Sequence, residues 1–128
     1  MTLQVIPIKI QKEVESDDDL VDLILESFEI NDGDILVFSQ KIISKNEGSV
    51  LSLSSVNPSL LASGIATSYD KDPRLVELIL SESKRIVRME NGIIIVETKH
   101  GFVCANAGID ESNVEHGYAT LLPNDPDK

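Results

Sequence analysis

The sequence predicts an α+β fold in which helices pack on a mixed, largely antiparallel sheet. Apolar segments of strand length and of helix length alternate irregularly along the chain, which disfavours a doubly wound parallel sheet. Asn91-Gly92, the strongest hairpin signal in the chain, separates two apolar segments and predicts an antiparallel pair of strands. Two pairs in which Asn or Asp precedes Pro have the residue order of helix starts.

The composition predicts a single globular domain over residues 1–128. Hydrophobic residues make up 41% of the chain and charged residues 26%, which is ordinary for such a domain. Apolar runs such as Ile93–Val96 are too short to cross a bilayer, so we expect no membrane association. The net charge of −11 disfavours nucleic-acid binding through a basic surface. A single cysteine, Cys104, permits no internal disulfide and favours a cytoplasmic location.

The first third of the chain predicts strand, helix and strand. Leu3–Ile10 has strand character, and Pro7 assigns it to a sheet edge or a bulge. Ser16 is the expected start of a helix, because three aspartates follow it at the positive end of the helix dipole. Ile35–Phe38 is expected to be a short buried strand. The helix should bury one face: Leu20, Leu23, Ile24 and Phe28.

The middle of the chain predicts two more helices. One should start at Asn57-Pro58 and the other at Asp72-Pro73, because each pair provides a side-chain acceptor followed by proline at the first helical position. The second helix should run over about Pro73–Ser83. Its spacing of apolar residues predicts four buried side chains: Leu75, Val76, Ile79 and Leu80.

The remaining elements follow the hairpin signal. Arg85–Met89 and Ile93–Glu97 are the two expected hairpin strands. The Gly/Asn-rich stretch His100–Val114 is expected to be irregular, and Tyr118–Leu122 to form a short apolar strand.

Gln40, Lys41 and Lys45 form the first segment with possible chemistry, directly after the predicted strand 35–38. Ligand sites in open sheets often lie beyond the carboxyl ends of strands. In a helical turn the two lysines stack on one side, and a bound phosphate would relieve their repulsion. They belong to a nearly neutral stretch of a chain that has ten acidic and no basic residues between Glu13 and Asp34. The sequence alone favours the simpler alternative of solvated surface lysines.

The second such segment runs over Asn106–Asn113. Asp110 supplies a hard oxygen ligand of the kind that Mg²⁺ or Mn²⁺ prefers, and Asn113 can hydrogen-bond a base, a ribose or a phosphate. A single carboxylate does not hold a divalent ion, however. An Asp/Asn-rich turn in which Asp110 caps a helix is an equally good interpretation.

The stretch His100–Cys104 gives no catalytic residue. Cys104 is interpreted as a small buried apolar residue, because the sequence places no base beside it. His100 and His116 are too isolated to be argued as a metal pair.

Three motifs together carry a family resemblance: IPIKI, DGDILVFSQKIISKNEG, and VETKHGFVCANAGIDESNV followed by LLPNDPD. Over essentially its whole length, the chain resembles the amino-terminal half of the coenzyme F420-0:γ-glutamyl ligase family. The resemblance implies a GTP-dependent ligase that uses Mg²⁺ or Mn²⁺ and adds L-glutamate in γ-linkage to coenzyme F420-0. It also implies an acyl-phosphate intermediate and a homodimer.

The resemblance assigns roles to individual positions. Gln40, Lys41 and Lys45 match a segment that contacts GTP, Asp110 matches a metal-binding aspartate, and Asn113 matches a nucleotide contact. A further GTP-contacting loop matches four residues: Gln11, Lys12, Glu13 and Val14. This loop departs from the family pattern, which often has a Gly-rich or Pro-containing turn there. Glu13 would face a nucleotide unfavourably unless its side chain points away.

The family pattern continues for about as many residues again after LLPNDPD, and further metal ligands lie in that part. We therefore expect the 128-residue chain to have little or no ligase activity alone. A truncated chain and one half of a split enzyme, with a separate chain supplying the missing half, are alternatives that the sequence leaves open. The alternatives are a non-catalytic nucleotide-binding or dimerisation module and a ligase for a different carboxylate.

Overall fold

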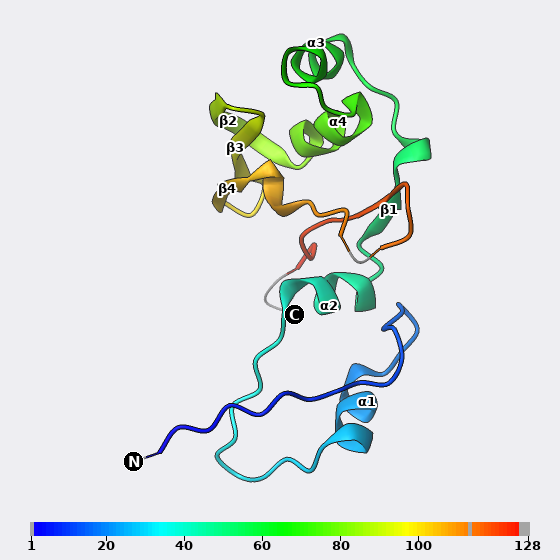
Figure 1. Cartoon of the computed structure of the whole chain (residues 1–128), viewed down its shortest axis with the longest axis vertical. Helices are drawn as coiled ribbons and strands as arrows, with labels where there is room; N and C mark the ends of the chain where they lie inside the picture. The colour runs from blue at the N-terminus through cyan, green and yellow to red at the C-terminus, as the bar shows by residue number, and fades with distance from the viewer. Residues whose placement is uncertain (1, 113, 126–128) are drawn as a thin grey trace.

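The computed structural model describes residues 2–112 and 114–125, and it confirms the predicted α+β class (Figure 1). All strand pairs among these residues are antiparallel. Along the chain the elements are α1 (Leu20–Ser27), α2 (Gln40–Asn46), β1 (Val50–Ser52), the 3₁₀ turn η1 (Leu53–Ser55), α3 (Leu60–Tyr69), α4 (Pro73–Ser81), β2 (Ser83–Glu90), β3 (Ile93–Thr98), β4 (Val103–Ala105), the 3₁₀ turn η2 (Asn106–Gly108) and β5 (Tyr118–Thr120).

The predicted hairpin supplies two strands of a three-stranded sheet in the order β2-β3-β4, with β3 at its centre. Glu90 pairs with Ile93 across the turn. Asn91 and Gly92 have φ angles of 50° and 76°, so both central residues take the left-handed conformation that a tight two-residue hairpin requires. The hairpin prediction is confirmed, with strands slightly longer than expected.

The main hydrophobic core lies where α3 and α4 meet β3. α4 begins as predicted at Pro73, and the Asp72 carboxylate caps it by accepting the amide hydrogen of Arg74 at 2.8 Å. The helix ends at Ser81 rather than Ser83, because β2 already starts there. Leu75 and Leu80 are only half-buried at the edge of the core. The core comprises Ala62, Ile65, Ala66, Val76, Ile79, Ile94, Val96 and Ala107.

The start of α3 corrects the predicted start at Asn57-Pro58. The N-cap is Ser59, whose hydroxyl accepts the amide hydrogen of Ala62 at 3.1 Å. Its own amide donates to Glu77 of α4 at 2.8 Å. Because the serine joins the helix start to α4, the helix begins two residues later than the Asn-Pro pair indicates.

A second, two-stranded sheet pairs β1 with β5. Val50 lies opposite Thr120, and an isolated bridge places Asp110 against Thr120. β5 ends at Thr120 rather than Leu122, and β1 was not predicted from the sequence. The stretch 100–114, predicted to be irregular, contains β4 and η2. Gly108 (φ 70°) packs so closely on Leu122 that an added Cβ would lie 2.7 Å from that side chain.

Residues 2–39 depart most from the predictions. Leu3–Ile10 and Ile35–Phe38 form no strand, and the second of these is exposed rather than buried. A strand needs a backbone partner, and the described part of the chain provides none for either segment. α1 starts at Leu20 with Asp19 as its N-cap, not at Ser16, because Asp19 accepts the amide hydrogens of Val21 and Asp22.

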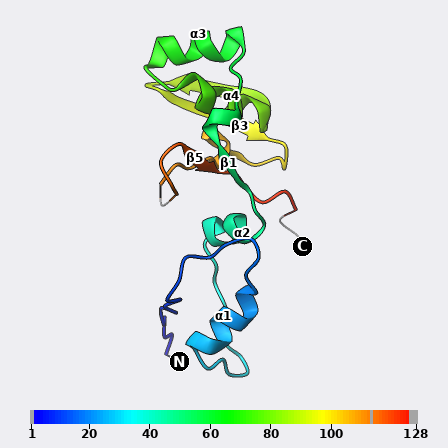
Figure 2. The same cartoon turned by 90° about the vertical axis from the view of Figure 1, so that its right-hand side faces the viewer.

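The predicted inner face of α1 is the less exposed one, with Ile24 buried and the other three residues half-buried. In Figures 1 and 2 this helix and the extended segments beside it lie beyond α2, at the opposite end of the molecule from α3. No helix in the described part of the chain is long and apolar enough to span a membrane.

Candidate functional site

Helix α2 carries the three residues of the predicted nucleotide-contacting segment, Gln40, Lys41 and Lys45. The side chains of Lys41 and Lys45 are only 23% and 14% exposed, so they are not the freely solvated lysines of the simpler alternative. Gln40 Nε2 donates to the carbonyl oxygen of Leu121 at 3.2 Å and also hydrogen-bonds Ser44. This side chain therefore ties the start of α2 to the segment that follows β5.

Asp110 is held by its backbone against the end of β5. Its amide donates to the Thr120 carbonyl at 3.1 Å, and its carbonyl accepts from the Thr120 amide at 2.8 Å and hydroxyl at 3.0 Å. The carboxylate remains 40% exposed. It accepts the Ser112 amide hydrogen at 2.9 Å, which closes an Asp/Ser turn. Asp110 thus sits in a turn, as the alternative interpretation held, but it does not cap a helix in the described residues.

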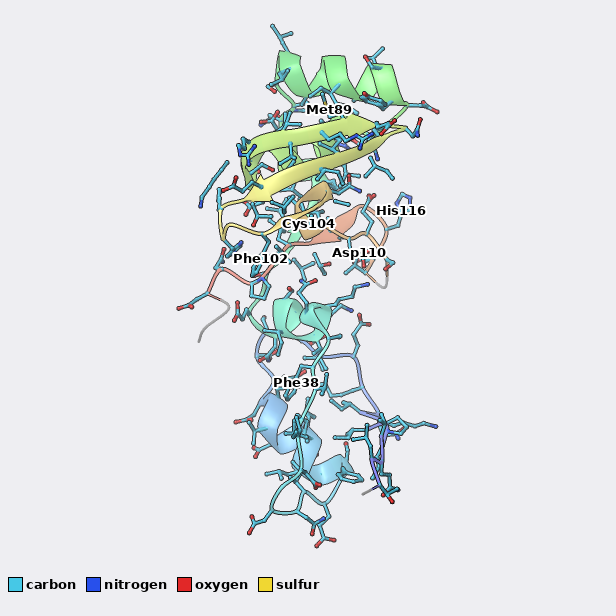
Figure 3. The ribbon with its side chains drawn as sticks, turned by 90° about the vertical axis from the view of Figure 1, so that its left-hand side faces the viewer. Phe38, Met89, Phe102, Cys104, Asp110 and His116 are labelled. Atoms are coloured by element: carbon cyan, nitrogen blue, oxygen red, sulfur yellow. The ribbon has the colours of Figure 1, made fainter. Side chains whose placement is uncertain are left out.

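Lys41 and Asp110 meet directly. The Lys41 ammonium forms an ion pair with Asp110 Oδ2 and donates to the carbonyl and hydroxyl oxygens of Ser112, at 3.1 and 2.7 Å. Ser112 Oγ in turn donates to Asp110 Oδ2 at 2.7 Å. In Figure 3 Asp110 lies between the β5 region and α2. The fold thus joins a helix to a loop that lies 71 residues further along the chain, counted from Lys41 to Ser112.

These hydrogen bonds stabilise the ionised form of the Asp110 carboxyl. The Lys41 ammonium, followed by the Ser112 hydroxyl and amide, lowers the pKa of the Asp110 carboxyl from 3.8 to about 2. The carboxyl is ionised near neutral pH, as it would be with the ordinary pKa, and these contacts keep it ionised down to a lower pH. Sequence reasoning missed Ser112; the signal that identifies it is a hydroxyl residue two positions after an aspartate in a turn.

Lys45 lies one helical turn beyond Lys41 and forms an ion pair with Glu13. The same lysine lowers the pKa of the Glu13 carboxyl. Glu13 therefore points towards the predicted nucleotide site, the orientation that was expected to be unfavourable for a nucleotide. Both residues line an open pocket of about 490 Å³, together with Val14, Glu15, Ser16, Asp17, Gly48, Val50, Val114, Glu115 and Tyr118.

Of the other residues in the predicted loop Gln11–Val14, Val14 also lines this pocket, whereas Gln11 and Lys12 do not. Val14 is buried, whereas Gln11 is exposed. Lys12 pairs with Asp18, which raises the pKa of the lysine. Asn113, the remaining predicted nucleotide contact, lies outside the described residues.

The donors around Asp110 fit only part of a metal site. No group of three His, Cys, Asp or Glu side chains that could hold a metal occurs in the described residues. Mg²⁺ is commonly bound through one or two carboxylates plus phosphate oxygens and water. Asp110 can provide one such carboxylate, and a metal bound there would need further ligands from outside the described residues. Cys104, which the sequence analysis interpreted as a buried apolar residue, is only half-buried on β4, opposite Val96.

Comparison with known proteins assigns the chain to a family. The family model described as F420-0:γ-glutamyl ligase matches residues 8–128, and the chain belongs to this family. Proteins named coenzyme F420:L-glutamate ligase are similar over most of it. The one from Methanopyrus kandleri is 46% identical over 99% of this chain and 50% of its own length. Those from Methanothermobacter thermautotrophicus and Archaeoglobus fulgidus are 50% identical over 89% and 39% identical over 99% of this chain.

The chain spans about half the length of these curated relatives and matches their amino-terminal half. The resemblance stated from the sequence motifs is therefore confirmed at the level of the family.

Proposed function

We propose that the chain provides the nucleotide-binding part of a GTP-dependent ligase that joins L-glutamate to coenzyme F420-0. The observation that carries the proposal is the Lys41–Asp110 ion pair, bridged by Ser112, with Lys45 one turn away on α2. The names of the relatives support F420 as the acceptor and L-glutamate as the added group.

The ion pairs suggest how a nucleotide would bind. Lys41 and Lys45 each face a carboxylate, that of Asp110 and that of Glu13 respectively. The oxygens of a triphosphate can replace the two carboxylates as partners of the ammonium groups, because phosphate oxygens are strong acceptors for charged donors. The Asp110 carboxylate would then lose its lysine partner and become available to a divalent cation. The exchange would leave the Asp110 carboxylate paired with the cation, whereas Glu13 would lose Lys45 and would have to turn away from the phosphates.

Phosphoryl transfer depends mainly on positioning and charge neutralisation, so the site needs no protein nucleophile. Bound Mg²⁺ or Mn²⁺ would neutralise charge on the phosphates. Lys41 and Lys45 would hold the phosphate groups while the γ-phosphoryl group passes to the F420-0 carboxylate. The glutamate amine would then attack the acyl phosphate, forming the amide bond and releasing phosphate. Ser112 would hold the Asp110 carboxylate in position throughout.

The activity of the whole ligase requires more than the described residues contain. Asp110 is one carboxylate, and the usual set of ligands needs more oxygens. We propose that the remaining ligands come from the half of the relatives that this chain does not span, and that the 128-residue chain alone ligates little or no glutamate. The same scarcity of ligands favours the second candidate function, a nucleotide-binding or dimerisation module without catalysis.

Calorimetric titration with GTP, in MgCl₂ or MnCl₂, tests the site. We expect Lys41→Ala and Asp110→Ala each to weaken GTP binding by about tenfold or more, since each removes a charged contact worth about 1.5–3 kcal/mol. Lys99→Ala is the matched control, because Lys99 directly follows β3 and pairs with Glu82, which directly precedes β2. Its affinity should stay within about twofold of the wild type. Equal affinities in all four proteins would refute the site.

A further inference from the structure

One end of the molecule exposes an unusual amount of apolar surface. It is built from residues 2–10, helix α1 and residues 33–38, and is called here the open apolar face. Val5 and Val37 are 85% and 90% exposed. Single exposed apolar side chains are normal, but a contiguous group marks an interaction site. Its exposed large apolar residues are Leu3, Val5, Ile6, Val21, Leu25, Ile35, Leu36, Val37 and Phe38.

The open apolar face encloses a hollow. A pocket of about 770 Å³ lies between the two extended segments and α1, with Ile24, Phe28 and Phe38 among its lining residues. Figure 3 shows Phe38 between α1 and α2. A dense protein core would fill such a volume with side chains, and the described residues fill the core of α3, α4 and β3, at the other end of the molecule, in that way. The hollow therefore has the form of a core that lacks one of its layers.

The backbone of the same face is also unpaired. Residues 2–10 and 35–38 run as extended segments (Figure 1), and no backbone hydrogen bond of theirs is found within the described chain. Extended segments with free amides and carbonyls are templates for an added strand. A bound polypeptide that adds a strand and inserts apolar side chains would both pair these backbone groups and fill the hollow.

We propose that the open apolar face is the docking surface for the polypeptide equivalent to the second half of the curated relatives, continuous with this chain or separate from it. That polypeptide would add at least one strand to residues 2–10 or 33–38 and insert apolar side chains into the hollow. The curated relatives are about twice as long as the matched region, so they contain a segment of the required size.

The path of the chain supports this occupant. The segment after β5 returns to α2, where the Leu121 carbonyl accepts from Gln40. Residues 33–38 lead directly into the same helix. A polypeptide that continues from the segment after β5 would therefore start beside the open apolar face.

A second copy of the chain fits the hollow less well. A two-fold contact brings the same patch of each copy together. Two concave faces opposed in this way leave the hollow empty, whereas a different segment can fill it. The proposal concerns only packing between polypeptides, so it stands or falls independently of the nucleotide site.

Co-expression tests the proposal. The 128-residue chain is produced with the carboxyl-terminal half of the Methanopyrus kandleri relative, without added nucleotide or metal. We expect a 1:1 complex by size exclusion with light scattering. Within it, hydrogen exchange should slow at residues 2–10 and 33–38 relative to the chain alone. Val5→Asp and Val37→Asp should each weaken the complex by about tenfold or more, because each puts a charge into an apolar interface.

Leu60→Asp is the matched control. Leu60 is 94% exposed at the start of α3, at the other end of the molecule. The affinity of the Leu60→Asp variant for the carboxyl-terminal half should therefore stay within about twofold of the wild type. All three substitutions lie on exposed side chains, and thermal melts of the isolated variants show whether each keeps its fold. Absence of a complex, a complex insensitive to Val5→Asp and Val37→Asp, or a homodimer that protects these segments instead would each overturn the proposal.

Discussion

The two ends of this molecule, residues 2–39 and the region of α3, α4 and β3, have similarly apolar sequences but bury very different numbers of apolar side chains. Around α3, α4 and β3, eight buried residues form one continuous cluster. Residues 2–39 contain comparable apolar segments, yet Val14 and Ile24 are their only buried hydrophobic residues in the described chain. The difference lies in partners, because the hairpin provides its own neighbouring strand and the segments at the other end do not. Apolar patterning thus identifies a surface that needs covering, and topology decides whether the same chain covers it.

The largest expected effect tests whether stability resides in the cluster around α4. Ile79→Ala removes a fully buried side chain and should lower the free energy of unfolding by about 2–5 kcal/mol. Val21→Ala on the exposed side of α1 should change it by less than about 0.5 kcal/mol. Urea denaturation followed by circular dichroism measures both. Similar losses for the two variants would mean that the two ends are equally packed in solution.

The N-caps of α4 and α1 give a second test of the difference in stability between the two ends. Asp72→Ala removes the cap of α4 and should lower the free energy of unfolding by about 1 kcal/mol, since α4 is part of the core. Asp19→Ala removes the cap of α1 and should speed hydrogen exchange at Val21 and Asp22 without moving the main urea midpoint. Asn at either position retains a capping oxygen and serves as the control. A shift of the midpoint by Asp19→Ala would place α1 in the same cooperative unit as α4.

The smallest effect concerns the contact that joins α2 to the rest of the fold. The Asp110 carboxyl should titrate at about pH 2 by NMR, and Lys41→Met should raise its pKa towards 3.8, because the hydrogen bond from the Lys41 ammonium is the main cause of the lowered pKa. Since the folded pKa lies below the ordinary value, the stabilisation is complete above about pH 4 and is lost as the pH falls towards 2.

Because Asp110 is 40% exposed, solvent screening limits this stabilisation to below about 1 kcal/mol. Lys99→Met is the control, since it leaves the Lys41–Asp110 pair intact. An unchanged Asp110 pKa in Lys41→Met would show that the ion pair does not form in solution.

Much of the fold was predictable where the signal was local. Asp72-Pro73 predicted the start of α4, and Asn91-Gly92 predicted the hairpin, because a cap and a tight turn are each satisfied within a few residues. The same reasoning misplaced the start of α3, where Ser59 forms contacts to Glu77 in the next helix. It also predicted strands at 3–10 and 35–38, for which the described chain offers no partner.

The residues of the candidate site likewise divide into those that could be identified from the sequence and one that only the structure identified. Residue type and motif singled out Lys41, Lys45 and Asp110, and the family resemblance brought in Glu13. Ser112, which contacts both Lys41 and Asp110, was missed, because its importance depends on a contact across the fold. The nucleotide roles of these residues remain predictions that the calorimetric experiment tests.

The sequence alone determined the family, the α+β class and the elements whose hydrogen bonds close within a short stretch of chain. Only the tertiary structure decided that α2 lies against the loop after η2, so that Lys41 pairs with Asp110. It also decided that residues 2–39 present an open apolar face. The physical reason is that local hydrogen bonds and turn conformations need only neighbouring residues, whereas ion pairs, strand partners and a filled core need segments distant in sequence to meet.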